Sequence, residues 1–189
     1  MSETTDLSPQ HRKLSKFLAL LLRHRPARFP IPLDADGYAS LDEVMRILKG
    51  LPNFRWAGRA DVQAVVDAPG RRRFEIAGER IRALYGHTAF RPEYEPVVPP
   101  EVLYHGTAPE NLTDIRREGL CSMARQYVHL AETAELARSI AVRHTAEPVL
   151  LRIAAATAHA AGMAFYHPTV GVYLCEAIPP DYISEEAKV

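Results

Sequence analysis

A proline-rich stretch separates this sequence into two parts and limits how the chain can fold. Four prolines lie between Phe90 and Pro100, where we find neither a helical nor an alternating apolar pattern. Proline interrupts helices and sheets, so such a stretch is typical of a linker between domains. A chain of 189 residues is long enough for two small domains. We therefore predict domains at residues 1–95 and 96–189.

The two predicted domains carry opposite charge, although the chain as a whole is neutral. Residues 1–95 hold 16 Lys and Arg against 12 Asp and Glu, and residues 96–189 hold 7 against 11. In the first domain, positive charge concentrates at Arg23 with His24 and at Arg71 to Arg73. Such fields attract phosphate groups, so this domain is a candidate for binding a polyanion. Ordinary surface charge is the alternative explanation.

The first domain opens with an amphipathic helix, predicted over residues 10–24. Apolar residues fall on one helical face, at Leu14, Phe17, Leu18, Leu21 and Leu22. Pro26 disfavours helical geometry at the residue before it, so Arg23 and His24 lie near the end of the helix. Positive side chains are favoured at that end, which gives both residues a purely structural explanation.

The rest of the first domain follows the order of a winged-helix module. The predicted segments are a turn at 33–39, a helix beginning after Ser40, a helix at 60–68, and strands at 73–77 and 80–85 that form a hairpin. Ser40 and Glu43 have the spacing of a capping box. Winged-helix modules bind nucleic acids in some proteins and are plain scaffolds in others, so the order alone assigns no function.

The second domain mixes short strands with helices. Strands are predicted at 102–104, 127–130, 149–153, 163–166 and 172–175, and helices at 109–119 and 132–144. Pro109 and Gly119 bound the first of these helices, as is common at helix starts and ends. The two domains together predict the α+β fold class.

Common signatures of catalytic and metal sites are absent from the sequence. It contains no GxxxxGK[ST], no GxGxxG after a strand, no HExxH and no CxxC. No two histidines have zinc-site spacing, so we expect no metal. Cys121 and Cys175 are too few for a disulfide framework, and we interpret both as buried or idle thiols. Lacking a long apolar run and a secretory signal layout, the chain is expected to be cytoplasmic.

The remaining candidates each have an ordinary structural explanation. They are Arg23, His24, Arg73, Arg125 and the tetrapeptide Tyr104-His105-Gly106-Thr107. Taken singly, Arg73 fits the solvent face of an edge strand, His105 a core histidine and Gly106 a turn.

Taken together, five blocks of the sequence resemble the RNA 2'-phosphotransferase family. They are LSKFLALLLRHRP, RRRFEI with IRALYGHT, LYHGT, GLCSMARQYVHL, and GMAFYHPTVGVYL before PPDYI, and they occur in the family's order from about Leu14 to Ile183. The resemblance implies a winged-helix-like N-terminal lobe and an ADP-ribosyltransferase-like C-terminal lobe. It also implies NAD+-dependent removal of an internal RNA 2'-phosphate, such as tRNA ligases leave at splice junctions.

The resemblance also implies the site residues. The family's catalytic quartet falls on Arg23, His24, Arg73 and Arg125. Its NAD+ site falls on His105, Gly106, Thr107, His129 and Leu130, with Arg143 near the pyrophosphate. Several arginine forks around one dianion can hold it and spread its charge, which suits the quartet to a phosphate. A glycine lets a cofactor approach the backbone closely.

The implied reaction has two steps and needs no metal. The RNA 2'-phosphate attacks C1" of the nicotinamide ribose, releases nicotinamide and gives a 2'-phospho-ADP-ribosylated RNA. The ribose 2"-OH then attacks phosphorus and releases RNA with a 2'-OH and ADP-ribose 1",2"-cyclic phosphate. His24 is a candidate for proton transfer in the second step, because histidine titrates near neutrality.

The sequence departs from the usual family pattern in the hairpin and the second lobe. Tyr85 replaces a common Gln, Tyr127 a His, Ala131 a Ser, Ala154 an Asp and Tyr173 a Trp, and residues 167–170 replace a Ser-rich stretch. The quartet and the His-Gly-Thr block are intact. We expect these departures to affect nicotinamide contacts or RNA preference more than the reaction class.

Two other functions fit the same residues. One is an ADP-ribosyltransferase that stops after the first step and caps terminal phosphates of RNA or DNA. The other is a non-catalytic sensor of nucleic acid or NAD+, which the intact quartet disfavours. A winged-helix transcription factor is weaker still, since residues 61–68, the nearest candidate for a recognition helix, contain no Lys or Arg. We expect a monomer.

Overall fold

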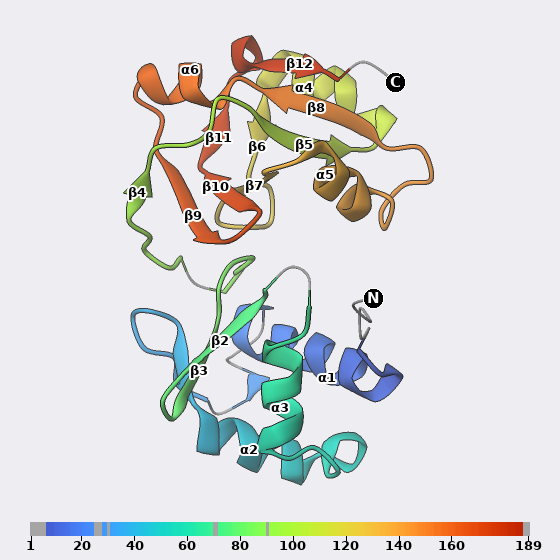
Figure 1. Ribbon diagram of the computed structural model, residues 1–189, viewed down its shortest axis with the longest axis vertical. Helices are drawn as coiled ribbons and strands as arrows, with labels where there is room; N and C mark the ends of the chain where they lie inside the picture. The colour runs from blue at the N-terminus through green and yellow to red at the C-terminus, as the bar shows by residue number, and fades with distance from the viewer. Residues whose placement is uncertain (1–6, 25–27, 30, 70–71, 90, 187–189) are drawn as a thin grey trace, which may run out of the picture. The chain divides into compact units, whose positions relative to one another are not determined.

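A computed structural model describes residues 7–24, 28–29, 31–69, 72–89 and 91–186 (Figure 1). The chain divides between Glu93 and Tyr94 into two compact units, called here the N-terminal and C-terminal units. Each unit has its own hydrophobic core. Pro26 and Arg71, which the sequence analysis singled out, lie outside the described residues.

The first helix of the N-terminal unit has the predicted extent but changes character near its end. Helix α1 runs Pro9–Ala19, and its N-cap Ser8 accepts a hydrogen bond from the backbone N–H of His11 at 3.2 Å. The segment η1, Leu20–His24, is π-helical. The predicted apolar face is confirmed: Leu14, Phe17, Leu18, Leu21 and Leu22 are all buried.

The middle of the N-terminal unit contains one strand and two helices. Its elements are strand β1 Tyr38–Ser40, helix α2 Leu41–Gly50, a 3-10 turn η3 Pro52–Phe54 and helix α3 Arg59–Val66. The predicted capping box at Ser40 is wrong, because that side chain makes no cap hydrogen bond. Ser40 instead pairs with Arg80 as the end of β1, and the backbone N–H of Leu41 bonds to the carbonyl of Glu79 at 2.9 Å.

The predicted hairpin is confirmed and completes the N-terminal unit. Strand β2, Phe74–Ala77, pairs antiparallel with β3, Arg80–Ala83. Strand β1 adds to β3, which makes a three-stranded sheet of order β1-β3-β2. The predicted turn at 33–39 therefore extends too far, because strand β1 begins at Tyr38. The apolar sides of α1, α2 and α3 pack with Phe74 and Ile81 of the sheet into one core.

The C-terminal unit is built on a seven-stranded antiparallel sheet of order β12-β8-β5-β7-β10-β9-β4 (Figure 1). The strands are β4 Pro96–Val97, β5 Leu103–Thr107, β7 Val128–Ala131, β8 Val149–Ile153, β9 Phe165–Thr169, β10 Val172–Cys175 and β12 Ile183–Glu185. Strands β6 Leu120–Cys121 and β11 Ala177–Ile178 form a separate pair. All five predicted strands of this part exist, and β8 and β10 have the predicted bounds.

One strand lies in the predicted linker. β4 pairs with β9 at the edge of the large sheet, with Pro96 opposite Tyr166. An edge strand tolerates proline because one of its sides needs no ladder hydrogen bonds. The stretch is therefore not a plain linker throughout.

Helices cover both faces of the large sheet. The predicted helix at 109–119 is a 3-10 turn η4 Pro109–Asn111 followed by α4 Leu112–Glu118, and α5 and α6 are Ala134–Ala141 and Ala155–Ala160. A short 3-10 turn, η5, spans Pro180–Tyr182. Ile115 of α4 and Ala158 of α6 pack in the larger core, whereas Ala137 of α5 packs with Ala131 and Leu150 on the other face. This arrangement confirms the α+β class.

Candidate active site

Arg23 is a buried arginine held by aromatic rings. It belongs to the π-helical turn η1, and only 9% of its surface is exposed. Its guanidinium carbon lies 5.3 Å from the ring centre of Phe74 and 4.8 Å from that of Tyr85. The Nη2 atom donates to the carbonyl oxygen of Arg73 at 3.1 Å. Arg23 is therefore turned into the N-terminal unit, and a solvent-facing role at a helix end does not explain it.

The end of η1 is tied to the chain that follows β3. The carbonyl oxygen of Arg23 accepts hydrogen bonds from the backbone N–H groups of Thr88 and Ala89, at 3.0 and 3.3 Å. Short π-helical segments are uncommon and occur frequently at functional sites. These bonds satisfy a carbonyl that a helix end would otherwise leave to solvent, and they hold Arg23 and His24 in place.

His24 and Arg73 lie beside Arg23 in the N-terminal unit. His24 is exposed, and its Nδ1 is 3.3 Å from the Thr88 hydroxyl. Arg73 directly precedes β2, is half-buried, and its Nη1 is 3.4 Å from the hydroxyl oxygen of Ser15 in α1. Its carbonyl also accepts from the N–H of Leu84 at 3.0 Å. Arg73 is thus linked to α1 and to the residue that follows β3, and the solvent face of an edge strand is the wrong description of it.

A buried histidine, which the sequence analysis did not select, completes this group. His87 is only 3% exposed. Burial, followed by the charges of Arg23, His24 and Arg82, lowers the pKa of His87 from its ordinary 6.5 to about 3. Its ring is therefore neutral near pH 7. Its only sequence signal was its place in the block IRALYGHT, four residues after Ala83.

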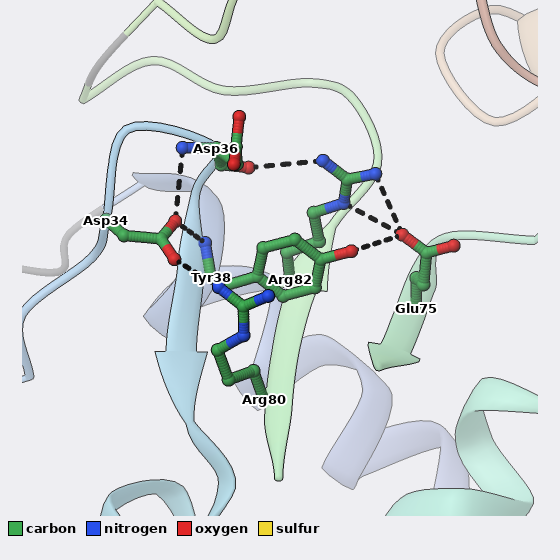
Figure 2. A network of polar contacts seen from close by, with 6 residues as sticks. All are labelled: Asp34, Asp36, Tyr38, Glu75, Arg80 and Arg82. Carbon is green, nitrogen blue, oxygen red and sulfur yellow. Dashed lines mark hydrogen bonds and ion pairs between the residues drawn. The ribbon is translucent and has the colours of Figure 1, made fainter. Parts of the chain in front are cut away.

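The sheet that carries Arg73 is braced by a polar network centred on Tyr38 (Figure 2). The Tyr38 hydroxyl donates to Glu75 at 2.7 Å, and Arg82 donates to the same carboxylate oxygen through Nε at 2.9 Å. Burial alone would raise the pKa of Glu75, but the hydrogen bonds from Tyr38 and Arg82 outweigh it and lower that pKa. The network joins all three strands of the sheet, since its members come from β1, β2 and β3.

The same network extends to the turn before β1. The guanidinium carbons of Arg80 and Arg82 lie 4.6 and 4.5 Å from the ring centre of Tyr38. Arg80 pairs with Asp34 at 3.0 Å, and Asp34 also accepts from the backbone N–H of Tyr38 at 2.8 Å. Both arginines of β3 are therefore engaged within the N-terminal unit, as Figure 2 shows.

In the C-terminal unit, His105 lies in β5 with a defined proton position. Its Nδ1 is 3.0 Å from the carbonyl oxygen of His129. Burial and, less strongly, the nearby charge of Arg125 lower its pKa, although the bond to His129 acts in the opposite sense. A carbonyl can only accept, so the neutral ring carries its proton on Nδ1 and presents Nε2 as an acceptor. Such an atom suits a ribose hydroxyl.

Arg125 lies close enough to His105 to affect it electrostatically. It is exposed, in the turn before β7, and its backbone N–H bonds to the carbonyl of Ser122 at 3.0 Å. Its charge is one of the causes of the lowered pKa of His105. The C-terminal unit therefore brings together one residue from the expected quartet and one from the expected NAD+ site.

Gly106 has a packing role within β5. A Cβ atom at this position would lie 2.5 Å from the Cβ of Ala141 and 2.8 Å from the carbonyl oxygen of Ala137, both in α5. The close contact of helix and strand therefore requires glycine whether or not a cofactor approaches the backbone. The alternative of a turn is wrong, because Gly106 lies inside a strand.

The other expected NAD+ residues occupy different environments. Thr107 is buried, and its hydroxyl accepts from the side-chain amide of Asn111 at 3.2 Å. His129 is half-buried and donates from Nδ1 to the carbonyl of Tyr127 at 3.0 Å. Leu130 packs in the larger core. Arg143 is exposed beyond the end of α5, and the structure does not join it to His105 and Arg125.

The described residues contain no cluster of three or more His, Cys, Asp or Glu that could hold a metal ion. Cys175 is buried, and burial raises the pKa of its thiol to about 12. Cys121 is exposed, so of the two expected alternatives, a buried or an idle thiol, burial applies to Cys175. Over the same part of the chain, no helix has the length and apolar character to cross a membrane.

Comparison with known proteins gives a consistent result over most of the sequence. Residues 9–177 match the model of the family described as RNA 2'-phosphotransferase, Tpt1 / KptA family. A probable RNA 2'-phosphotransferase of Acetivibrio thermocellus is 37% identical over 177 residues, which cover 93% of this chain and 97% of the relative. One from Pseudomonas aeruginosa is 40% identical over 175 residues, covering 90% and 94%. The chain therefore belongs to the RNA 2'-phosphotransferase family.

Proposed function

We propose that this protein removes an internal 2'-phosphate from RNA with NAD+ as co-substrate, and that it releases nicotinamide. Family membership supports the reaction class. The observation that carries the proposal is the cluster in the N-terminal unit, where Arg23 is bonded to Arg73 and adjoins His24. Winged-helix and ADP-ribosyltransferase-like folds for the two units are part of the same proposal.

The RNA 2'-phosphate is the group that the arginines bind. Arg23 and Arg73 present planar guanidinium groups, which match phosphate oxygens in pairs. Because Arg23 is fixed by Phe74, Tyr85 and a backbone carbonyl, it binds with little further loss of side-chain freedom. The guanidinium charges also stabilise the phosphate as its bonds change.

NAD+ is the second substrate, and the side chains of β5 fit it. His105 presents Nε2 as an acceptor for a ribose hydroxyl, since its Nδ1–H is engaged by the carbonyl of His129. Arg125 adds a positive charge beside that position, which favours the approach of a phosphate to the nicotinamide ribose. A cofactor role for Gly106 is not needed to explain that residue.

The reaction proceeds in two displacements. A 2'-phosphate oxygen forms a bond to C1" while the bond to nicotinamide breaks, and nicotinamide leaves with the electron pair. In the second step the 2"-hydroxyl gives up its proton as its oxygen bonds to phosphorus, and the bond from phosphorus to the RNA 2'-oxygen breaks as that oxygen takes up a proton. His24, which is exposed and lies beside Thr88, is the candidate for moving that proton.

The test is to incubate the protein with NAD+ and an RNA that carries one internal 2'-phosphate, and to resolve the products by mass. The proposal expects RNA with a 2'-OH, nicotinamide and ADP-ribose 1",2"-cyclic phosphate. An RNA that keeps ADP-ribose at the end of the reaction would indicate a capping ADP-ribosyltransferase instead. Binding without nicotinamide release would indicate a sensor.

A further inference from the structure

We propose that Tyr85 is a positioning residue for phosphate binding, which acts by holding the Arg23 guanidinium in one orientation. The inference rests on the proposed function, because it assigns Arg23 to the RNA phosphate. Tyr85 itself belongs neither to the expected quartet nor to the expected NAD+ site.

Two aromatic rings from different parts of the sheet lie beside the Arg23 guanidinium. Phe74 begins β2, and Tyr85 follows the end of β3 by two residues. Both side chains are buried, with 1% and 2% of their surfaces exposed. Their ring centres lie 5.3 and 4.8 Å from the guanidinium carbon, within the range of a cation–π interaction. Tyr85 makes the closer of the two contacts.

A hydrogen bond further limits how the guanidinium can turn. Its Nη2 donates to the carbonyl of Arg73 at 3.1 Å. The turn at Gly86 lies next to the guanidinium, since a Cβ added there would come within ordinary van der Waals contact of Nη1, at 3.4 Å. Gly86 has a φ of +83°, a conformation that favours glycine, and this turn directly follows Tyr85. The rings and the carbonyl together hold the position and the rotation of the group.

A fixed guanidinium matters for recognising a phosphate. Arginine has a long side chain, and ordering it on binding costs free energy that a pre-ordered side chain has already lost on folding. The paired donors of the fork also bind phosphate well only when they face its oxygens. Removing the ring of Tyr85 should therefore weaken phosphate binding without removing any group that contacts the RNA.

The experiment compares Tyr85→Phe, which keeps the aromatic ring, with Tyr85→Leu, which replaces the ring by an aliphatic side chain. Rotation of the Arg23 guanidinium is measured by NMR on arginine labelled with nitrogen-15, with Arg23→Lys used to assign its signal. This readout does not depend on activity. We expect slow rotation in the natural protein and in Tyr85→Phe, and faster rotation in Tyr85→Leu.

The same variants are then assayed with NAD+ and 2'-phosphorylated RNA. We expect Tyr85→Leu to lower kcat/KM about tenfold, the size of a partly buried cation–π contact, chiefly through a higher KM. Tyr85→Phe should stay within about threefold of the natural protein. Should Tyr85→Leu not fold, Tyr85→Met repeats the comparison with a more adaptable side chain.

Tyr38→Leu is the matched control, because Tyr38 also lies against arginine side chains of this sheet. It should lower Tm and leave the rotation of Arg23 unchanged. The inference is overturned if the Arg23 guanidinium of Tyr85→Leu rotates as slowly as that of the natural protein, or if Tyr85→Leu keeps the natural KM. It is also overturned if Tyr85→Phe loses as much kcat/KM as Tyr85→Leu. If the natural protein does not turn over the RNA, the proposed function fails, whereas the rotation measurement still decides the role of Tyr85.

Discussion

Replacing Gly106 by alanine tests whether this glycine serves packing or the cofactor. The new Cβ would lie 2.5 Å from the Cβ of Ala141 and 2.8 Å from the carbonyl oxygen of Ala137. Non-bonded carbon atoms prefer about 3.5–4.0 Å, so α5 must move away from β5. Such overpacking costs about 1–3 kcal/mol. For a unit of this size, the loss corresponds to a fall in Tm of roughly 5–15 °C.

A double-mutant cycle with Ala141→Gly separates the two contacts. The second change removes the Cβ at 2.5 Å but leaves the Ala137 carbonyl at 2.8 Å, so it should relieve only part of the damage. We expect a coupling of about 1 kcal/mol between the two substitutions. Denaturant unfolding gives the free energies, and hydrogen exchange at the amides of β5 identifies the unit that is destabilised.

A Gly106→Ala protein as stable as the natural one would refute this reasoning. It would be refuted equally if the two substitutions were additive, because the contact with Ala141 would then carry no weight. In the first case a cofactor role would be the remaining explanation of the glycine, and NAD+ affinity would fall without any change in Tm.

Three other predictions follow from the N-terminal unit. Arg23→Lys keeps the charge but loses the fork and the ring contacts, so kcat/KM for 2'-phosphorylated RNA should fall by about a hundredfold, measured by nicotinamide release. Because the pKa of His87 falls from 6.5 to about 3 on folding, the unfolded chain takes up its proton first, and stability should drop as pH falls below 6.5. The slope from this one group is up to about 1.4 kcal/mol per pH unit, and urea unfolding should find it removed in His87→Gln. Folding lowers the pKa of Glu75, so its stabilising effect is present above its ordinary pKa of 4.5 and is lost on further acidification. The difference in Tm between the natural protein and Glu75→Gln should therefore be largest near pH 7 and should shrink as the pH falls below 4.5.

Repeating patterns in the sequence predicted the main helices and strands. The spacing of Leu14, Leu18 and Leu21 predicted the first helix, and all three side chains are buried in the core. Strands at 149–153 and 172–175 were also predicted correctly, because short runs of mostly apolar residues mark buried strands. The spacing of apolar residues indicates which side chains are buried, and it can be found in the sequence without any knowledge of tertiary contacts.

Features that depend on a distant partner were not predictable in this way. The apolar pattern of residues 20–24 is the same for an α-helix and a π-helix, and the hydrogen bonds from Thr88 and Ala89 come from a segment more than sixty residues later. Strand β4 exists because β9 offers an edge, although its own sequence is rich in proline. Ser40 pairs with Arg80 at the end of β1, and its side chain does not make the predicted cap hydrogen bond.

The candidate site was predicted from resemblance, and its surroundings were not. The motifs selected Arg23 and Arg73, which the structure joins by a hydrogen bond, and Arg125, whose charge acts on His105. The neighbouring Tyr85 was noted only as a departure from the family, and its ring contact with Arg23 depends on the turn after β3.

The central claim is that nicotinamide release and loss of the RNA 2'-phosphate are one coupled reaction. It is tested most directly by measuring both in a single-turnover experiment, with NAD+ labelled in the nicotinamide ring and RNA labelled in the 2'-phosphate. The account predicts one nicotinamide released for each 2'-OH formed, and no release with RNA that lacks the phosphate. RNA dephosphorylated without nicotinamide release, or nicotinamide released equally without the phosphate, would contradict it.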